Sequence, residues 1–316
     1  MSELVHGLVV REQSGFFGVE VPDRTIYTCR LRGRLMEEAQ SSDIAAIGDR
    51  VQISVIDAET GTIEAVEERK NALSRAVRTE GNRGAGAAER EQVIIANVDQ
   101  ALFVFAAAQP PPSFRMIDRF LVAGEKAGID RLMIVVNKID LDGDGSSHAL
   151  FEPYRQMNYP VLLTSARLGV GVDELRDSLR DKISVFTGPS GVGKTSLLNT
   201  VQPGLGRVVK SVSRLKQEGM HTTRDSELVR LETGGYLADT PGIRTLTMWD
   251  VEPEELDAYF RDIAPYVSEC RFGDCTHTSE PGCAVREAVT AGKINRTRYD
   301  SYRSLRAELE EAYATY

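Results

Sequence analysis

The clearest chemical pattern in this sequence is a glycine-rich loop between an apolar run and an amphipathic one. ISVFTGPSGVGKTSLLN (183–199) contains G-x-x-x-x-G-K-T from Gly188 to Thr195. Between a strand and a helix this pattern predicts a phosphate-binding loop, in which backbone N–H groups surround the β-phosphate, Lys194 reaches the β and γ oxygens and Thr195 ligates Mg²⁺. A glycine-rich turn without a ligand is the alternative. The nucleotide-binding residues expected here are Gly188, Pro189, Ser190, Gly191, Val192, Gly193, Lys194, Thr195 and Ser196.

A second motif, Asn137-Lys138-Ile139-Asp140, follows the apolar run LMIVV and indicates which base is bound. The Asp140 carboxylate can accept hydrogen bonds from guanine N1–H and N2–H₂, whereas adenine has an acceptor at N1 and would leave it unpaired. The run YPVLLTSA ends at Ser165 and Ala166, where a backbone amide could meet guanine O6. The motif alone could be a surface turn, but the two runs together favour guanine.

Two later segments could complete a magnesium and γ-phosphate site. GGYLADTPG ends in D-T-P-G, where Asp239 would hold Mg²⁺ through water and the Gly242 amide would sense the γ-phosphate; these four residues alone fit a plain turn equally well. Before this run lies a polar, basic stretch that contains Thr222 and Thr223, and we take Thr223 as the second hydroxyl ligand of Mg²⁺. The polarity of this stretch is typical of a switch segment that the γ-phosphate orders.

Three of the four cysteines and one of the four histidines fall within fourteen positions near the C-terminus: Cys270, Cys275, His277 and Cys283. Thiolates and imidazole are the ligands of tetrahedral Zn²⁺, and four protein ligands leave no position for water. We therefore expect one structural Zn²⁺, with unpaired buried cysteines as the alternative. Cys29 stays outside the cluster.

The elements that must position these residues change in type along the chain. Residues 1–75 contain short β-like runs separated by Gly and Asp turns, which predict an OB-like β-barrel, and 76–91 are typical of a linker or mobile loop. From there to 250, apolar runs alternate with amphipathic ones, one of them near 148–157, which predicts a parallel α/β sheet with helices on both faces. Helical periods around the cysteines predict a small α-rich domain at 251–316.

The motifs stand in an unusual order. N-K-I-D (137–140) and T-S-A (164–166) precede the phosphate loop, while H-T-T-R (221–224) and D-T-P-G (239–242) follow it. In a Ras-like GTPase the phosphate loop comes first, so this order predicts a circularly permuted GTPase domain. A permutation keeps the same strands and loops in space, and the nucleotide site survives it.

This order, with a barrel before it and a cysteine cluster after it, resembles the bacterial small ribosomal subunit biogenesis GTPase family, RsgA (YjeQ). The resemblance covers essentially the whole chain and includes IIANVDQ (94–100), NKIDL, GPSGVGKTSLLN, GMHTTR, DTPGIR, the C-x₄-C-x-H-x₅-C run and RYDSY. It implies a GTPase that docks on the small ribosomal subunit and its rRNA late in assembly, with GTP and GDP as substrate and product, Mg²⁺ and stimulation by the subunit. An RNA-binding checkpoint module whose nucleotide gates affinity, with negligible turnover, is the alternative.

The resemblance also bears on catalysis. Ile243 occupies the position after D-T-P-G that carries a catalytic Gln in Ras-like enzymes, and it cannot orient water. His221 matches the histidine thought to fill this role in the family, and an imidazole within reach of water could position or polarise it. An exposed switch residue that contacts RNA is an equally good interpretation of His221.

The composition restricts the partners. The 316 residues are 41% hydrophobic, enough for two or three cores, and the net charge of −9 limits RNA contact to local basic surfaces. Arg30, Arg32 and Arg34 alternate along one expected strand and would face phosphates together, although a solvated face is the plain alternative. The switch stretch adds Lys210, Arg214 and Lys216 as candidate RNA contacts.

No apolar run approaches the roughly 18–20 residues of a membrane helix, and the N-terminus lacks the basic start and long apolar core of a signal peptide. We expect a cytoplasmic, monomeric protein without a membrane partner.

Overall fold

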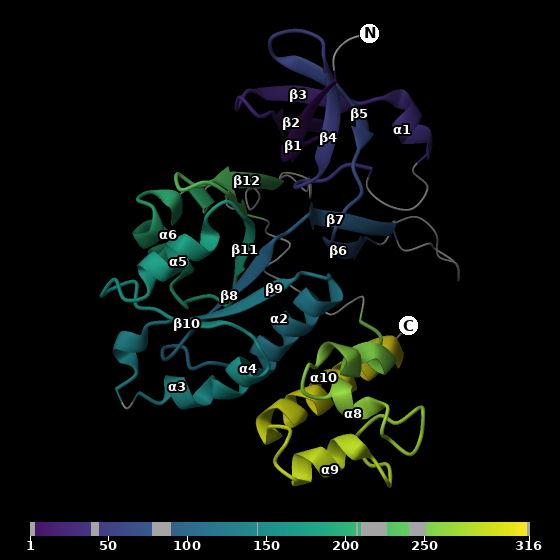
Figure 1. Cartoon of the computed structure of the whole chain (residues 1–316), viewed down its shortest axis with the longest axis vertical. Helices are drawn as coiled ribbons and strands as arrows, with labels where there is room; N and C mark the ends of the chain where they lie inside the picture. The colour runs from purple at the N-terminus through teal and green to yellow at the C-terminus, as the bar shows by residue number, and fades with distance from the viewer. Residues whose placement is uncertain are drawn as a thin grey trace.

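The computed structural model describes residues 4–38, 44–77, 90–143, 145–206, 208–209, 226–239 and 251–314, and for 36–38, 75–77, 90, 91, 226 and 239 the backbone alone. Three parts follow one another from N- to C-terminus: a β-barrel, an α/β layer and a group of helices (Figure 1). In this described part of the chain, no helix is long and apolar enough to cross a membrane.

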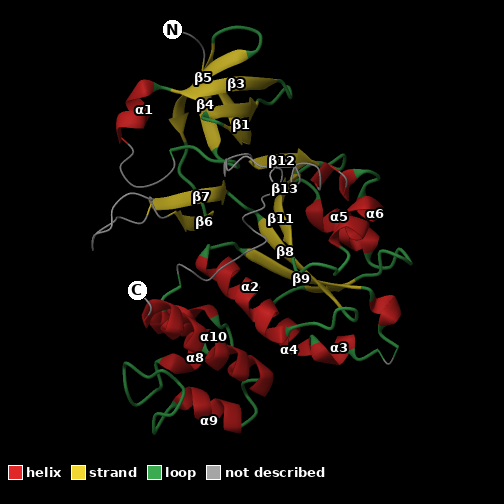
Figure 2. Ribbon diagram, turned by 180° about the vertical axis from the view of Figure 1, so that it is seen from behind, coloured by secondary structure: helices red, strands yellow, loops and turns green. Residues whose placement is uncertain are grey.

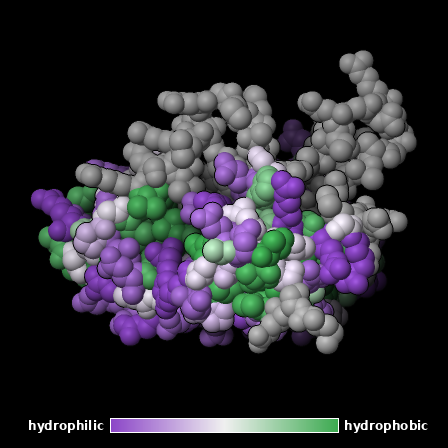
Figure 3. Space-filling model, turned by 90° about the horizontal axis from the view of Figure 1, so that it is seen from above, coloured by the Kyte–Doolittle hydropathy of each residue, from purple (hydrophilic) through white to green (hydrophobic). Residues whose placement is uncertain are grey.

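The first part is a closed five-stranded barrel, as predicted. Its strands are β1 (Leu4–Gln13), β2 (Phe16–Glu20), β3 (Ile26–Leu31), β4 (Arg50–Val55) and β5 (Thr60–Val66). They pair in the order β1-β2-β3-β5-β4, and β4 closes the barrel on β1. Alternate side chains such as Val51 and Ile53 point inward and are fully buried, as the twofold period of a strand requires. Seen from the barrel end, hydrophilic residues surround small apolar patches (Figure 3).

The short helix α1 (Gly33–Glu38) corrects the prediction for the barrel arginines. β3 ends at Leu31, so Arg32 lies in the connection and Arg34 in the helix. The three side chains therefore do not alternate along one strand. Because the helical segment is only six residues long and begins at Gly33, its sequence carries too few periods to distinguish it from an extended run.

Two strands flank the segment that the sequence predicts as a linker. β6 (Ala72–Val77) and β7 (Arg90–Ala96) pair antiparallel from Ala72↔Ala96 to Val77↔Arg90. They extend into the predicted range 76–91 by two residues at each end. The division of the chain at about residues 75 and 250 stays a prediction.

The second part is built on a parallel sheet with the order β10-β9-β8-β11-β13, which confirms the predicted α/β class. These strands are β8 (Gln100–Ala106), β9 (Arg131–Asn137), β10 (Val161–Leu163), β11 (Ile183–Thr187) and β13 (Tyr236–Asp239). A sixth strand, β12 (Ser226–Arg230), joins β13 antiparallel. The sheet then continues into the barrel, because β12 also pairs with β1 through Arg11↔Glu227 and Glu12↔Ser226. The sequence did not indicate this continuity.

Helices cover both faces of this sheet (Figure 2). Phe103 and Phe105 of β8 pack in one core with α2 (Phe114–Lys126), whereas Leu102 and Val104 pack in another with α5 (Val172–Leu179) and α6 (Lys194–Val201). The helix predicted near 148–157 is instead two short ones, α3 (Ser147–Leu150) and α4 (Glu152–Gln156). Pro153 lies in the first turn of α4, where its missing N–H is tolerated, whereas inside a continuous helix it would remove a hydrogen bond.

The third part is α-rich, as predicted, with η3 (Pro253–Tyr259), α8 (Ala264–Val267), α9 (Ala284–Thr290) and α10 (Arg296–Ala314). It contacts the α/β part through α2, and charged groups mark this contact. Arg298 of α10 pairs with Asp118 of α2 and, at 2.9 Å, with Asp262 of its own part, and both partners of the first pair are buried. Lys126 of α2 pairs with Glu255 of η3 at 2.6 Å.

Candidate functional site

The glycine-rich loop lies where predicted, between β11 and α6. Gly193 adopts a φ of 95°, and a Cβ there would lie 2.4 Å from the Asn137 amide nitrogen, so only glycine fits. A Cβ at Gly188 would lie 2.0 Å from the Val104 carbonyl oxygen. The loop thus runs against β8 and the end of β9, too close for a side chain at either glycine.

Lys194 begins α6 and folds back over this loop. Its Nζ donates to the carbonyl oxygens of Gly188 and Pro189, both at 2.6 Å. Ser190, Thr195 and Ser196 are exposed, the latter two in the first turn of the helix, while Val192 is buried beneath the loop. The arrangement places one cation and two helix-start hydroxyls at a helix N-terminus, which suits a bound phosphate with its metal.

Asn137 fastens three segments together at the end of β9. It is 1% exposed, its Nδ2 donates to Val192 O at 2.9 Å, and its Oδ1 accepts from Ala166 N at 3.1 Å. Lys138 follows with a φ of 62°, and its Nζ donates to Gly191 O at 2.7 Å and to Gln109 O. The N-K-x-D and S-A motifs, predicted from separate runs, therefore meet at the phosphate loop.

Asp140 carries the carboxylate expected to read the base. Ser165 Oγ donates to its Oδ1 at 2.6 Å, which orients the carboxylate, and Arg167 Nη1 lies 4.0 Å from its Oδ2. The Asp140 side chain is 10% exposed, so a ligand would meet it in a largely dry setting where its hydrogen bonds discriminate strongly.

The carboxyl edge of the parallel sheet also receives β13. This strand pairs parallel with β11 and ends at Asp239, so the D-T-P-G motif begins at the same edge as the phosphate loop. The Asp239 side chain is outside the described atoms. His221, Thr223, Gly242, Lys210, Arg214 and Lys216 lie outside the described residues.

The barrel arginines are already engaged by neighbours. The Arg30 guanidinium lies 4.4 Å from the centre of the Phe16 ring, and Arg32 pairs with Glu64. Both remain exposed, as does Arg34.

Gln109 belongs to none of the predicted motifs, yet its carbonyl oxygen accepts a hydrogen bond from the Lys138 ammonium beside the phosphate loop. It stands in the loop after β8 and is the first residue of the Q-P-P-P run (109–112). The only sequence signal for this loop is its place after a strand at the ligand edge of an α/β sheet.

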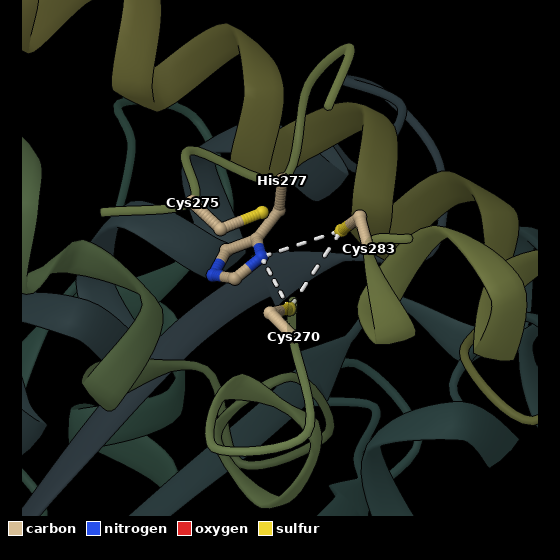
Figure 4. Close-up of side chains that lie close together, drawn as sticks. All are labelled: Cys270, Cys275, His277 and Cys283. Atoms are coloured by element: carbon tan, nitrogen blue, oxygen red, sulfur yellow. Dashed lines mark hydrogen bonds between the residues drawn. The ribbon is translucent and has the colours of Figure 1, made fainter. Parts of the chain in front are cut away.

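The four predicted metal ligands come together in the third part (Figure 4). Their ligand atoms all lie within 4.8 Å of one another, with Nδ1 of His277 3.5 Å from the sulfurs of Cys270 and Cys283, which are 3.9 Å apart. Tetrahedral Zn²⁺ with bonds of about 2.3 Å to sulfur and 2.0 Å to nitrogen would need roughly 3.8 Å between sulfurs and roughly 3.5 Å from sulfur to nitrogen. The distances among Cys270, His277 and Cys283 therefore fit a zinc ion, and the Cys275 sulfur lies within 4.8 Å of these three ligand atoms as the fourth ligand.

Comparison with known proteins identifies the family. The model of the RsgA GTPase family matches residues 66–249, and that of the RsgA N-terminal domain matches 6–63. The chain is 42% identical to the small ribosomal subunit biogenesis GTPase RsgA of Gemmatimonas aurantiaca, with 98% of this chain and 99% of that protein covered. The chain belongs to the RsgA GTPase family. Its RsgA relative from Chlorobaculum tepidum is 40% identical over 98% of this chain and 100% of its own length.

Solved structures of this family share the fold. YjeQ from Thermotoga maritima matches with a TM-score of 0.77 at 36% identity, covering 97% of this chain and 99% of its own. YloQ, described as a circularly permuted GTPase, matches with a TM-score of 0.75 at 32% identity, covering 98% and 96%. An RsgA-type chain is a GTP hydrolase, and this one acts on a guanine nucleotide in a circularly permuted domain.

Proposed function

We propose that this GTPase acts in ribosome biogenesis by docking on the small ribosomal subunit late in its maturation, where the subunit stimulates GTP hydrolysis. The carrying observation is that relatives named small ribosomal subunit biogenesis GTPase align with barrel, GTPase part and cysteine cluster together, over 98% of this chain. A nucleotide switch alone would need only the α/β part. The presence of the two flanking parts therefore supports the proposal of a large partner.

The proposed roles in the nucleotide site follow from the contacts described above. Residues 188–196 hold the phosphates, Asp140 accepts from guanine N1–H and N2–H₂, and Ser165 holds that carboxylate in place. Ala166 N, which donates to Asn137 Oδ1 here, would donate to guanine O6 in the bound state. Thr195, Thr223 and Asp239 would hold Mg²⁺, and the Gly242 amide would contact the γ-phosphate.

For catalysis, we assign His221 the task of orienting the attacking water. Ile243 offers no hydrogen bond at the usual glutamine position, so intrinsic hydrolysis should be slow. A partner that places His221 next to the water would accelerate the reaction, because general acid–base or positioning groups contribute about 10²–10⁴-fold when correctly aligned.

The test is GTP turnover by the full chain with and without purified small subunits. We expect strong stimulation by the subunits, and a loss of about 10²-fold or more of the stimulated rate in His221→Ala. His148→Ala is the matched control, because His148 is exposed on α3 and belongs to none of the nucleotide-binding motifs.

Two results would redirect the proposal. Unstimulated turnover together with nucleotide-dependent subunit binding would favour the RNA-binding checkpoint module with negligible turnover. Normal stimulated turnover in His221→Ala would leave RNA contact as the role of this histidine.

For the partner surface, we propose rRNA contact by Arg30, Arg32 and Arg34 on the barrel and by Lys210, Arg214 and Lys216 beside the nucleotide. Support comes from the exposure of the barrel arginines on a chain whose net charge is −9, which leaves phosphate attraction to local groups. Charge reversal at these positions should weaken subunit binding and flatten its salt dependence; an unchanged salt slope would remove the assignment. We also propose that the protein is a monomer and acts in the cytoplasm.

A further inference from the structure

The two ring nitrogens of His277 face different partners. Nδ1 lies 3.5 Å from each of the Cys270 and Cys283 sulfurs, whereas Nε2 lies 3.0 Å from Oδ2 of Asp257. In Figure 4 the ring turns one nitrogen toward the sulfurs and the other away from them. The His277 side chain is 1% exposed and that of Asp257 14%, so water hardly competes for this contact.

This arrangement selects one tautomer of the imidazole. A neutral imidazole carries a single N–H, and a metal ligand needs its lone pair on the other nitrogen. Because a carboxylate can only accept, Asp257 holds the proton on Nε2. The Nδ1 lone pair is then directed between the sulfurs, where a tetrahedral metal would lie.

The backbone of His277 is held from a second side. Its φ of 61° is uncommon for a residue other than glycine, and Tyr299 of α10 donates to its carbonyl oxygen at 2.7 Å. Tyr302 donates to the neighbouring Thr276 carbonyl at 3.1 Å. α10 therefore fixes where the side chain begins, and Asp257 fixes how the ring is turned.

We propose that Asp257 is the positioning residue of the metal centre, holding the His277 ring so that Nδ1 completes a Cys₃His site. Asp257 lies on η3, twenty residues before His277 and outside the cysteine cluster. η3 also carries Glu255, which pairs with Lys126 of α2 at 2.6 Å. The Asp257 carboxylate thus connects the Cys₃His cluster to η3, which contacts α2 of the GTPase part. This inference is independent of the proposed ribosomal function.

The experiment measures zinc affinity of the full chain by competition with a chromophoric chelator. Loss of the carboxylate partner of a metal-bound histidine typically costs about 10–100-fold in affinity, and this is the loss expected for Asp257→Ala. Asp257→Asn keeps a neutral acceptor and should lose less. Asp274→Ala removes an exposed carboxylate next to Cys275 and should keep wild-type affinity.

A double-mutant cycle separates positioning of the ring from general support of the fold. His277→Cys converts the centre to four cysteines, a set that also binds Zn²⁺ and has no ring to orient. On that background Asp257→Ala should cost less than about twofold. Co²⁺ absorption bands of each variant report its ligand set.

Equal zinc affinities for Asp257→Ala and Asp274→Ala would overturn the proposal. So would an Asp257→Ala loss that is as large in the four-cysteine background as in the native one, because Asp257 would then act on the fold and not on the histidine.

Discussion

At the scale of single residues, the choice of base depends on the direction of hydrogen bonds at Asp140. Its carboxylate is oriented by Ser165 and largely shielded from water, so it can accept two hydrogen bonds from guanine. Asp140→Asn replaces one carboxylate oxygen, an acceptor, by an NH₂ donor. Guanine N2–H₂ would then face another donor, whereas the carbonyl oxygen of xanthine at this position could accept a hydrogen bond from it. We expect about a 10²–10³-fold weaker affinity for GTP and a gain for XTP, measured with fluorescent nucleotides.

The control for this change is Asp130→Asn. Asp130 is an exposed carboxylate just before β9, at the opposite end of the strand from Asp140, and should leave both affinities unchanged. If Asp140→Asn weakened GTP and XTP binding equally, it would have damaged the loop and not the base contact.

The residues of the phosphate loop were predictable because their partners in space are also their neighbours in sequence. Lys194 folds onto Gly188, six residues earlier, and a strand–loop–helix pattern contains all of that geometry. Gln109 and Asp257 were not predictable. The first acts through a carbonyl, which every residue has, and the second meets His277 from twenty residues away.

At the scale of elements, the contact of α10 with α2 depends on a buried arginine. Arg298 is 2% exposed and lies between Asp118 and Asp262. Burial raises the pKa of the Asp118 carboxyl, and Arg298 opposes that shift. Arg298→Met would leave two carboxylates without their cation, and breaking a buried pair in this way costs about 3–5 kcal/mol.

We therefore expect Arg298→Met to lower the denaturant midpoint and to increase hydrogen exchange in α2 and α10. Arg296→Ala, on the same helix, removes an exposed pair with Asp300 and should change stability by less than about 0.5 kcal/mol. Equal midpoints for the two variants would show that apolar packing alone holds the helices together.

Elements with strong periodicity were predictable, and contacts between them were not. β8 is apolar from Ala101 to Ala106 and α2 is regularly amphipathic, so their types follow from the sequence. The pairing of β1 with β12 joins residues 11 and 227, and no local pattern encodes that distance. The helix at Arg34 was missed for the opposite reason, because six residues give too little periodicity.

At the scale of the whole molecule, the barrel joins the GTPase sheet through the pairing of β1 with β12, whereas the metal-binding part packs its core against α2. Val10 of the barrel strand β1 packs in the core that contains Phe103 of β8. The third part buries Leu256, Phe260, Tyr302 and Leu305 in another cluster, to which α2 contributes Val122. Disorder that begins in the third part should therefore stop at the contact of α10 with α2.

Removal of zinc tests whether the third part can lose order while the GTPase part keeps its structure. Burial and the neighbouring Cys283 sulfur raise the pKa of the Cys275 thiol to about 12, so the free thiol is protonated at neutral pH and metal binding must release its proton. Zinc occupancy should consequently fall as the pH is lowered, and a chelator should strip the metal more readily at pH 6 than at pH 8.

Without metal, we expect increased hydrogen exchange in α9 and α10, because the metal no longer links the ligand segment 270–283 together and this segment no longer holds the two helices against η3. Affinity for GDP should change by less than about threefold, because the phosphate loop and its partners Asn137 and Lys138 are held by contacts within the α/β part. Restoring Zn²⁺ should restore protection in the helices. GDP affinity that falls in step with zinc loss would show that the metal-binding part supports the nucleotide site directly, through α2 and the Gln109 loop that precedes it.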